Sequence, residues 1–196
     1  MPSMAKVTGV LLAGGQGSRM GGVDKGLQEF RGKPMAAHAL ERLAPQVDEI
    51  LINANRNAEE YASFGYRVIA DEIEGFAGPL AGFERGLAHA SGELVVTVPC
   101  DSPFLPADLV ARLREALERE GADLAVAKTG GQAHPVFSLM RRGVHDSLTR
   151  FLASGQRKID RWYAALKVIE VPFDDEADAF LNINTREELA NLEPRG

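Results

Sequence analysis

A glycine-rich segment with two basic residues follows the first apolar run of the sequence. Residues 14–26 contain six glycines, and Arg19 and Lys25 lie among them. Glycine adopts positive φ without strain and permits close approach, so backbone N–H groups of such a segment can converge on phosphate oxygens. The two cations suit a triphosphate and the charge that develops on a transferring phosphorus. The segment therefore predicts a phosphate-binding loop.

This loop differs from the two best-known glycine-rich patterns. Lys25 is followed by Gly26, whereas a Walker A loop requires Ser or Thr there. The spacing after Gly15 and Gly17 places Met20 where a dinucleotide-binding fingerprint requires Gly or Ala. A surface loop that binds nothing is the alternative, but a solvated linker has no need of two cations among its glycines. The pattern favours a different class of nucleotide site.

An acidic residue follows another strand-like run. Leu94–Val98 is apolar and ends in a Pro-Cys-Asp-Ser-Pro segment that contains Asp101. The carboxyl ends of parallel strands share one edge of a sheet, so Asp101 is expected beside the glycine-rich loop. Mg²⁺ prefers one or two carboxylates together with phosphate and water, which makes Asp101 the candidate metal ligand. A turn or cap role is the alternative for Asp101, and Cys100 is expected to pack in the core.

The elements that must position these residues alternate between strands and helices. This order predicts a three-layer α/β/α domain, a mainly parallel sheet covered by helices on both faces, that spans residues 1–196. Strands are expected at Val7–Leu12, Ile50–Asn53, Arg67–Ala70, Leu94–Val98, Leu124–Ala127, Val136–Met140 and Val168–Val171. Helices are expected at Asp108–Glu120 with Gly121 as the stop, at Val144–Leu152, after Pro34 and Pro79 in first-turn positions, and after a capping box of Thr185 and Glu188.

Composition limits the classes of partner. The chain of 196 residues is 45% hydrophobic, carries a formal charge of −6 and contains one cysteine. A net negative charge disfavours binding to nucleic acid or to an anionic membrane surface, so an anion needs a local pocket. The single cysteine fits a reducing compartment, and Val7–Ala13 is too short to span a bilayer. These features predict a cytoplasmic protein that binds neither nucleic acid nor membrane.

At the level of motifs the sequence resembles the molybdenum cofactor guanylyltransferases. Leu12-Ala13-Gly14-Gly15, followed by Ser18 to Leu27, matches the signature loop of that family almost residue for residue. The later motifs follow in the same order along essentially the whole chain: Gly32-Lys33-Pro34, Asn53-Ala54-Asn55-Arg56, Gly78-Pro79-Leu80-Ala81-Gly82, Pro99-Cys100-Asp101-Ser102-Pro103, His134-Pro135 and Asn182-Ile183-Asn184-Thr185.

The resemblance implies a Rossmann-like nucleotidyltransferase that transfers GMP from Mg²⁺·GTP to the phosphate of molybdenum-loaded molybdopterin and releases pyrophosphate. It implies GTP contacts at Leu12, Ala13, Gly14, Gly15, Lys25, Asn53, Asp71 and Asp101, catalytic roles for Arg19, Lys25 and Asp101, and an Mg²⁺ ligand at Asp101. From the residues alone, Asn53 and Asp71 can equally be turn residues at strand ends. Residues 1–128 would form the GTP and Mg²⁺ part, and residues 129–196 the pterin side.

The acceptor side has fewer signals. Arg157, Lys158, Asn182 and Asn184 are the candidates for pterin contacts, because a second anionic ligand requires donors. Close relatives often have an Arg pair where this chain has Arg157 and Lys158, and Lys lacks the planar guanidinium fork. His134 fits a ligand contact and a loop position before proline equally well. Transient contacts with cofactor-biosynthesis proteins and with recipient molybdoenzymes are implied, since the pterin is labile.

Other functions compete with this interpretation. A molybdopterin cytidylyltransferase would use CTP on the same acceptor, but that branch of the family typically has Ala-Gly in place of the Gly14-Gly15 pair. A sugar-phosphate nucleotidyltransferase would usually be longer. A GTP-binding regulatory protein without catalysis has no need to retain both Lys25 and Asp101. A dinucleotide-dependent oxidoreductase is disfavoured by the broken fingerprint.

Overall fold

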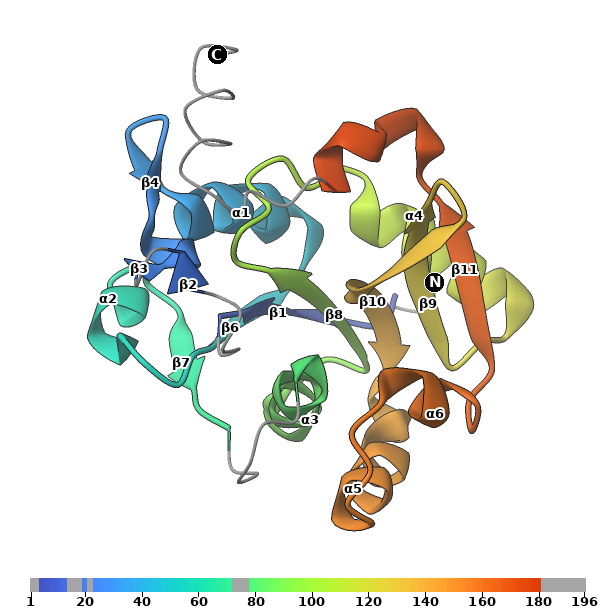
Figure 1. The fold of residues 1–196 in the computed structure, drawn as a ribbon. Helices are drawn as coiled ribbons and strands as arrows, with labels where there is room; N and C mark the ends of the chain where they lie inside the picture. Colours follow the sequence, from blue (N-terminus) through green and yellow to red (C-terminus); the bar gives the residue numbers. More distant parts are fainter. Residues whose placement is uncertain (1–3, 14–18, 21–22, 72–77, 181–196) are drawn as a thin grey trace.

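The computed structural model describes residues 4–13, 19–20, 23–71 and 78–180. Within them, seven strands form one sheet in the order β11-β9-β10-β8-β1-β6-β7 (Figure 1). β10 runs antiparallel to both neighbours, and the other adjacent strands are parallel, so the expected mainly parallel sheet is confirmed. The strands are β1 (Val7–Leu12), β6 (Glu49–Asn53), β7 (Arg67–Ile69), β8 (Leu94–Pro99), β9 (Leu124–Thr129), β10 (Gln132–Arg141) and β11 (Val168–Pro172).

Helices cover both faces of this sheet. Figure 1 shows α1 and α4 on one face and α3, α5 and α6 on the other, as a three-layer α/β architecture requires. α2 lies beside β7 at the end of the sheet. The helices are α1 (Met35–Leu43), α2 (Ala58–Ala62), α3 (Pro79–His89), α4 (Leu109–Glu120), α5 (His145–Ala153) and α6 (Ile159–Tyr163).

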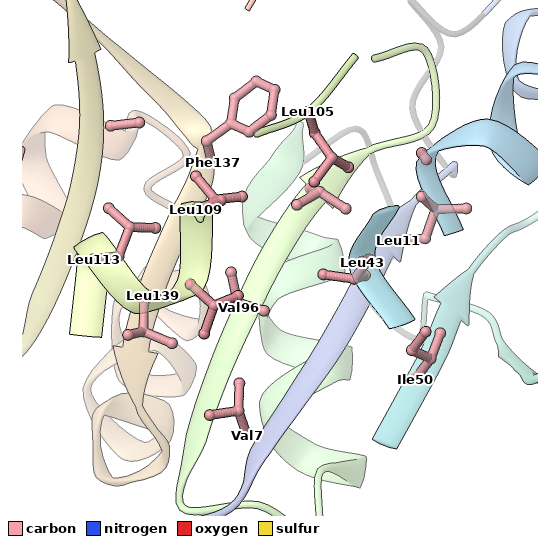
Figure 2. Close-up of a cluster of buried hydrophobic side chains, with 14 of the residues drawn as sticks. Val7, Leu11, Leu43, Ile50, Val96, Leu105, Leu109, Leu113, Phe137 and Leu139 are labelled. Carbon is pink, nitrogen blue, oxygen red and sulfur yellow. The ribbon is translucent and has the colours of Figure 1, made fainter. Parts of the chain in front are cut away.

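Two hydrophobic clusters join the layers. In the first, side chains of α1 and α4 meet one face of the sheet, and Figure 2 shows Leu43, Leu109 and Leu113 directed at the strands that carry Val96 and Leu139. The second cluster lies on the opposite face under α3, α5 and α6 and includes the buried Phe83, Leu148 and Trp162. Strands β1 and β8 are buried between the clusters, which explains their continuous apolar sequences.

The predicted helix ends are mostly confirmed. Gly121 ends α4 in the left-handed region at φ +59°, a conformation that glycine adopts without strain. Pro79 is the first residue of α3, as predicted. The first-turn position of Pro34 is wrong by one residue: Pro34 precedes α1 as its N-cap and pairs with Glu29. The cause is a tight hairpin of β4 (Glu29–Phe30) and β5 (Lys33–Pro34), in which Pro34 remains extended.

Strand β10 differs from its predicted span of Val136–Met140. It extends from Gln132 to Arg141, and its pairing with β9 shifts register between His134 and Ser138. The Thr97 hydroxyl donates a hydrogen bond of 2.9 Å to the Val136 carbonyl in this irregular part. The predicted capping box of Thr185 and Glu188 lies outside the described residues. No helix in the described part of the chain has the length and apolar character of a membrane span.

Candidate functional site

The carboxyl edge of the sheet brings the predicted nucleotide residues together. Leu12, the last residue of β1, pairs with Asn53 on one side and with Pro99 on the other. Beyond the strands, the Ala13 N–H donates to the Asn53 carbonyl at 2.8 Å and the Cys100 N–H donates to the Leu12 carbonyl at 3.1 Å. β1 and β8 are neighbours in the sheet, but the chain continues from β1 to β6 on one side and from β8 to β9 on the other. Open α/β sheets bind ligands where the connections diverge in this way.

Lys25 and Asp101 form an ion pair at this edge. Lys25 Nζ lies 3.7 Å from Asp101 Oδ2, and each side chain is 13% exposed. Burial raises the pKa of Asp101, and the positive charge of Lys25 opposes that rise without cancelling it. The two charges that the sequence predicted to act together therefore share one sparsely hydrated location. An anionic ligand can meet the cation there, and a metal ion can meet the carboxylate.

Asp24 holds the segment that carries Lys25. Lys25 begins a short 3₁₀ helix, η2 (Lys25–Leu27), and Asp24 is its N-cap. Asp24 Oδ1 accepts hydrogen bonds from the Gly26 N–H at 3.1 Å and from the Tyr61 hydroxyl at 2.6 Å. Asp24 Oδ2 accepts a third from Asn57 Nδ2 at 3.2 Å. Three donors from two parts of the chain therefore anchor the end of the glycine-rich loop.

Gly26 allows η2 to lie against the end of β8. A Cβ atom at Gly26 would lie 2.4 Å from the Tyr61 hydroxyl and 2.9 Å from Cys100 Cβ, distances that real Cβ contacts do not reach. Cys100 is buried, and burial raises the pKa of its thiol, so the predicted packing role fits its surroundings. The close approach explains why glycine follows Lys25 here.

Two asparagines hold the carboxylate of Asp71. Asn53 Nδ2 donates to Asp71 Oδ1 at 2.9 Å, and Asn55 Nδ2 donates to Asp71 Oδ2 at 3.0 Å. The Asp71 N–H in turn donates to Asn55 Oδ1 at 2.8 Å. Asp71 follows β7 and Asn53 ends β6, so these bonds form one fixed array of amide and carboxylate groups beside Leu12. Such an array can recognise the polar edge of a base or a ribose.

The start of α3 packs directly on this array. A Cβ atom at Gly82 would lie 2.6 Å from Leu12 Cδ2 and 2.7 Å from Asn53 Oδ1. Only glycine therefore permits this helix to approach the ends of β1 and β6 so closely. Gly78, the N-cap of α3, adopts φ +59°, and Pro79 follows it in the first turn. In the Gly78–Gly82 motif, Gly78 therefore permits the turn before α3, and Gly82 permits the close packing of α3 on the strand ends.

One carboxylate at this edge is a candidate ligand for a divalent metal ion. In the described residues, no group of three or more His, Cys, Asp or Glu side chains is arranged to hold a metal, so a cage made only of protein ligands is not found there. Mg²⁺ needs only one or two carboxylates when phosphate and water complete its shell. Asp24 is occupied by protein donors, which leaves Asp101 as the candidate ligand. The neighbouring Ser102 hydroxyl is buried and has no partner within the described residues.

Some predicted residues lie partly or wholly outside the described part of the chain. The backbone of Arg19 is described: it belongs to β2 (Arg19–Met20) and pairs with Asp24 of β3 (Val23–Asp24). The pairing places the Arg19 backbone beside the residue that anchors Lys25. Gly14, Gly15, Asn182 and Asn184 lie outside the described residues.

The remaining candidates lie in the carboxyl-terminal third. Arg157 Nη1 donates to the carbonyls of Leu152 and Gln156 at 3.0 and 2.8 Å, bonds that join it to its own segment. Lys158 is the N-cap of α6 and makes no side-chain capping bond. His134 bonds with Thr129 Oγ1 and stacks on Phe180 with 5.1 Å between ring centroids. Burial lowers the pKa of His134.

Several residues of the site had no predicted role. Asp24, Asn55 and Gly82 lie within the motifs that carry the family resemblance, so their motif membership was an available signal. Tyr61 belongs to none of those motifs. Its hydrogen bond to Asp24 joins residues 37 positions apart, which no local pattern in a sequence indicates.

The sheet order defines an α/β domain with polar residues at its carboxyl edge, and comparison with known proteins identifies it as a nucleotidyltransferase and gives its family. A model of the MobA-like NTP transferase domain matches residues 9–169. The chain is 53% identical over 187 residues to the molybdenum cofactor guanylyltransferase of Shewanella amazonensis, with 95% of each chain covered. It is 54% identical over 194 residues to that of Cupriavidus necator, with 96% of this chain and 97% of the relative covered. The chain belongs to the molybdenum cofactor guanylyltransferase family.

Solved structures agree with this fold. Molybdopterin-guanine dinucleotide biosynthesis protein A from Archaeoglobus fulgidus superposes with a TM-score of 0.80 at 27% identity, covering 96% of this chain and 97% of that one. A 4-diphosphocytidyl-2C-methyl-D-erythritol synthase from Anaerococcus prevotii reaches a TM-score of 0.77 at 15% identity, covering 97% and 96%. The second likeness concerns the fold alone.

Proposed function

We propose that this protein transfers GMP from Mg²⁺·GTP to the terminal phosphate of molybdenum-loaded molybdopterin, giving molybdopterin guanine dinucleotide and pyrophosphate. The observation that carries the proposal is the Lys25–Asp101 pair of 3.7 Å at the carboxyl edge of the sheet. The family supplies the expectation of a nucleotide and a molybdopterin substrate. The pair supplies a cation for phosphate and a carboxylate for metal in one place.

The nucleotide occupies the edge between β7 and β8 in this proposal. Leu12, Ala13, Gly14 and Gly15 contribute backbone groups, and Asn53 and Asp71 bind the base or the ribose. The hydrogen bonds between Asn53, Asn55 and Asp71 support this role, because they fix the direction of each polar atom before the ligand arrives. The triphosphate then extends toward Lys25 and Asp101.

Asp101 would hold Mg²⁺ together with phosphate oxygens. The ion, when bound, polarises the α-phosphoryl group and offsets negative charge on the leaving pyrophosphate. Lys25 donates to phosphate oxygens and keeps a positive charge beside the reacting phosphorus. Arg19 is the second proposed cation, on the strand that pairs with the anchoring residue Asp24.

The proposed reaction is an in-line displacement. An oxygen of the pterin phosphate attacks the α-phosphorus of GTP, and a new phosphorus–oxygen bond forms. The bond between the α-phosphorus and the oxygen that bridges to the β-phosphorus breaks, and pyrophosphate leaves with that electron pair. The acceptor phosphate is already ionised at neutral pH, so no general base is needed. Positioning and charge stabilisation therefore account for the catalysis.

The acceptor is proposed to bind on the side formed by residues 129–196, with residues 1–128 binding GTP and Mg²⁺. Arg157, Lys158, Asn182 and Asn184 are the proposed pterin contacts. We place the reaction in the cytoplasm, where Cys100 remains a thiol. Transfer of the labile product to cofactor-biosynthesis proteins and recipient molybdoenzymes would follow by transient contact.

Label transfer tests the proposed reaction and its base selectivity. Purified protein is incubated with Mg²⁺, molybdenum-loaded molybdopterin and either GTP or CTP that carries label on the α-phosphate. Transfer of label to the pterin from GTP alone is the expected result. Transfer from CTP alone would contradict the guanylyl assignment. GTP binding without transfer from either nucleotide would favour a regulatory protein over an enzyme.

A further inference from the structure

The hydroxyl of Tyr61 lies beneath the segment that carries Lys25. Tyr61 belongs to α2 and is fully buried, with 0% of its surface exposed. Its hydroxyl donates to Asp24 Oδ1 at 2.6 Å, and the same oxygen accepts the Gly26 N–H at 3.1 Å. One carboxylate oxygen of Asp24 therefore holds the backbone on both sides of Lys25, and the hydrogen bond from Tyr61 keeps that oxygen in place.

The same hydroxyl also lies close to the segment that carries Asp101. The Tyr61 hydroxyl and Cys100 both lie against Gly26: a Cβ added at Gly26 would lie 2.4 Å from the hydroxyl and 2.9 Å from Cys100 Cβ. Cys100 immediately precedes Asp101, and its N–H is bonded to Leu12 at the end of β1. The phenol thus lies close to both segments whose charged side chains form the ion pair of the site.

Core packing alone does not account for a tyrosine at this position. A phenylalanine ring would fill the same apolar space, whereas the hydroxyl adds a hydrogen bond to a charged acceptor, a stronger class of hydrogen bond. Burial raises the pKa of Tyr61, so the phenol stays protonated and acts as a donor. Asn57, just before α2, donates to the other oxygen of Asp24 at 3.2 Å. α2 and its N-cap Asn57 thus hold both oxygens of one carboxylate.

We infer that Tyr61 is a positioning residue that holds Lys25 against the triphosphate of the nucleotide. The inference rests on the proposed function, because it requires Lys25 to bind phosphate. Tyr61 acts through Asp24 and not through contact with the nucleotide itself. The array of Asn53, Asn55 and Asp71 is bonded separately, so loss of the hydroxyl should leave recognition of the nucleoside part intact.

The preference for GTP over GMP separates positioning from a purely structural role. Lys25 acts on phosphates, so its misplacement weakens binding of the triphosphate more than binding of the monophosphate. A structural defect lowers the fraction of folded protein and changes binding of both nucleotides alike. Calorimetry reports stoichiometry together with affinity, so inactive protein is counted and does not distort the comparison.

The experiment measures Kd for GTP and for GMP with Mg²⁺ in the wild-type protein, in Tyr61→Phe and in Tyr66→Phe. Tyr66 is a half-buried tyrosine near α2 and serves as the matched control. For Tyr61→Phe we expect GTP to bind roughly tenfold more weakly, the effect of losing one hydrogen bond to a charged group, and GMP to change less than about twofold. Tyr66→Phe should bind both nucleotides as the wild type does.

Two results would overturn the inference: unchanged affinity for both nucleotides in Tyr61→Phe, or equal weakening of GTP and GMP. If Tyr61→Phe does not fold, Asn57→Ala decides, because it removes an exposed donor to the same Asp24 carboxylate and should lower the GTP preference in the same direction. A wild-type protein without any preference for GTP would instead contradict the proposed phosphate role of Lys25, and the inference would fail with it.

Discussion

Replacing Gly82 with alanine should separate nucleotide binding from folding. The new Cβ would lie 2.7 Å from Asn53 Oδ1, and ordinary contact begins at 3.4 Å, so the asparagine must retreat by roughly 0.7 Å. That displacement strains its hydrogen bond of 2.9 Å to Asp71. A hydrogen bond to a charged group contributes about 1.5–3 kcal/mol, so GTP should bind roughly 10-fold to 100-fold more weakly.

The effect of Gly82→Ala on folding combines two opposing contributions. Alanine in a helix interior gains about 0.5–1 kcal/mol over glycine. Overpacking in a well-packed region costs about 1–3 kcal/mol. The net loss is about 0–2.5 kcal/mol, and each kcal/mol lowers the unfolding midpoint of a chain of this size by about 2–4 °C.

Gly86→Ala is the matched control for that experiment. Gly86 lies one turn further along α3, and its added Cβ would lie 2.7 Å from Val10 Cγ2 in the interior of the sheet. The steric conflict is similar, but the displaced side chain is apolar. Calorimetric titration with GTP and thermal unfolding of both variants give the comparison. Similar unfolding midpoints with weak binding in Gly82→Ala alone are expected, and equal GTP affinities would refute the role given to Asn53.

Three further substitutions test other parts of the site and fold. Asp101→Asn should lower label transfer at least about 100-fold. Burial raises the folded-state pKa of Asp101, so ionisation of this carboxyl lowers the stability of the folded protein, and the variant should unfold at the same or a higher temperature at neutral pH. Any such gain in stability should vanish below about pH 4, where Asp101 is protonated in the folded and unfolded states alike. A lower midpoint at neutral pH would contradict the burial argument. Asn55→Ala removes one donor to Asp71 and should weaken GTP binding about fivefold or more in calorimetry. Unchanged GTP affinity would show that Asn55 is not needed to hold Asp71 for the nucleotide. Arg112→Lys loses the guanidinium that lies 4.0 Å from the centre of the Phe173 ring and should lower the unfolding midpoint by about 2–4 °C without changing GTP affinity. Weaker GTP binding would show that the contact between Arg112 and Phe173 also affects the nucleotide site.

The sequence pattern predicted the sheet and the helix ends well because those features depend on local periodicity. Continuous apolar runs such as Val7–Leu12 became strands buried on both faces. The apolar stripe of Asp108–Glu120 became α4, which ends at Gly121 as predicted. The placement of Lys25 and Asp101 at one edge of the sheet also followed from a simple rule, since the glycine-rich loop and Asp101 both follow carboxyl ends of parallel strands.

Features that depend on contacts between distant segments were not predicted. The hairpin of β4 and β5 has two residues in each strand, too few for an alternating pattern. The register shift in β10 depends on pairing with β9, which the sequence of β10 alone does not specify. Tyr61 was missed for the same reason, because it lies outside the motifs and 37 positions from its partner Asp24, and only the folded chain brings them together.

The location of a bound nucleotide and metal ion tests whether the carboxyl edge of the sheet is the nucleotide site. The protein would be crystallised with Mn²⁺ and a GTP analogue whose α–β bridge is a methylene group and cannot be cleaved. We expect an anomalous peak for Mn²⁺ beside Asp101, the triphosphate against Lys25, and the nucleoside beside Asn53 and Asp71. A nucleotide bound away from the carboxyl edge, or a metal ion without Asp101 among its ligands, would contradict the account.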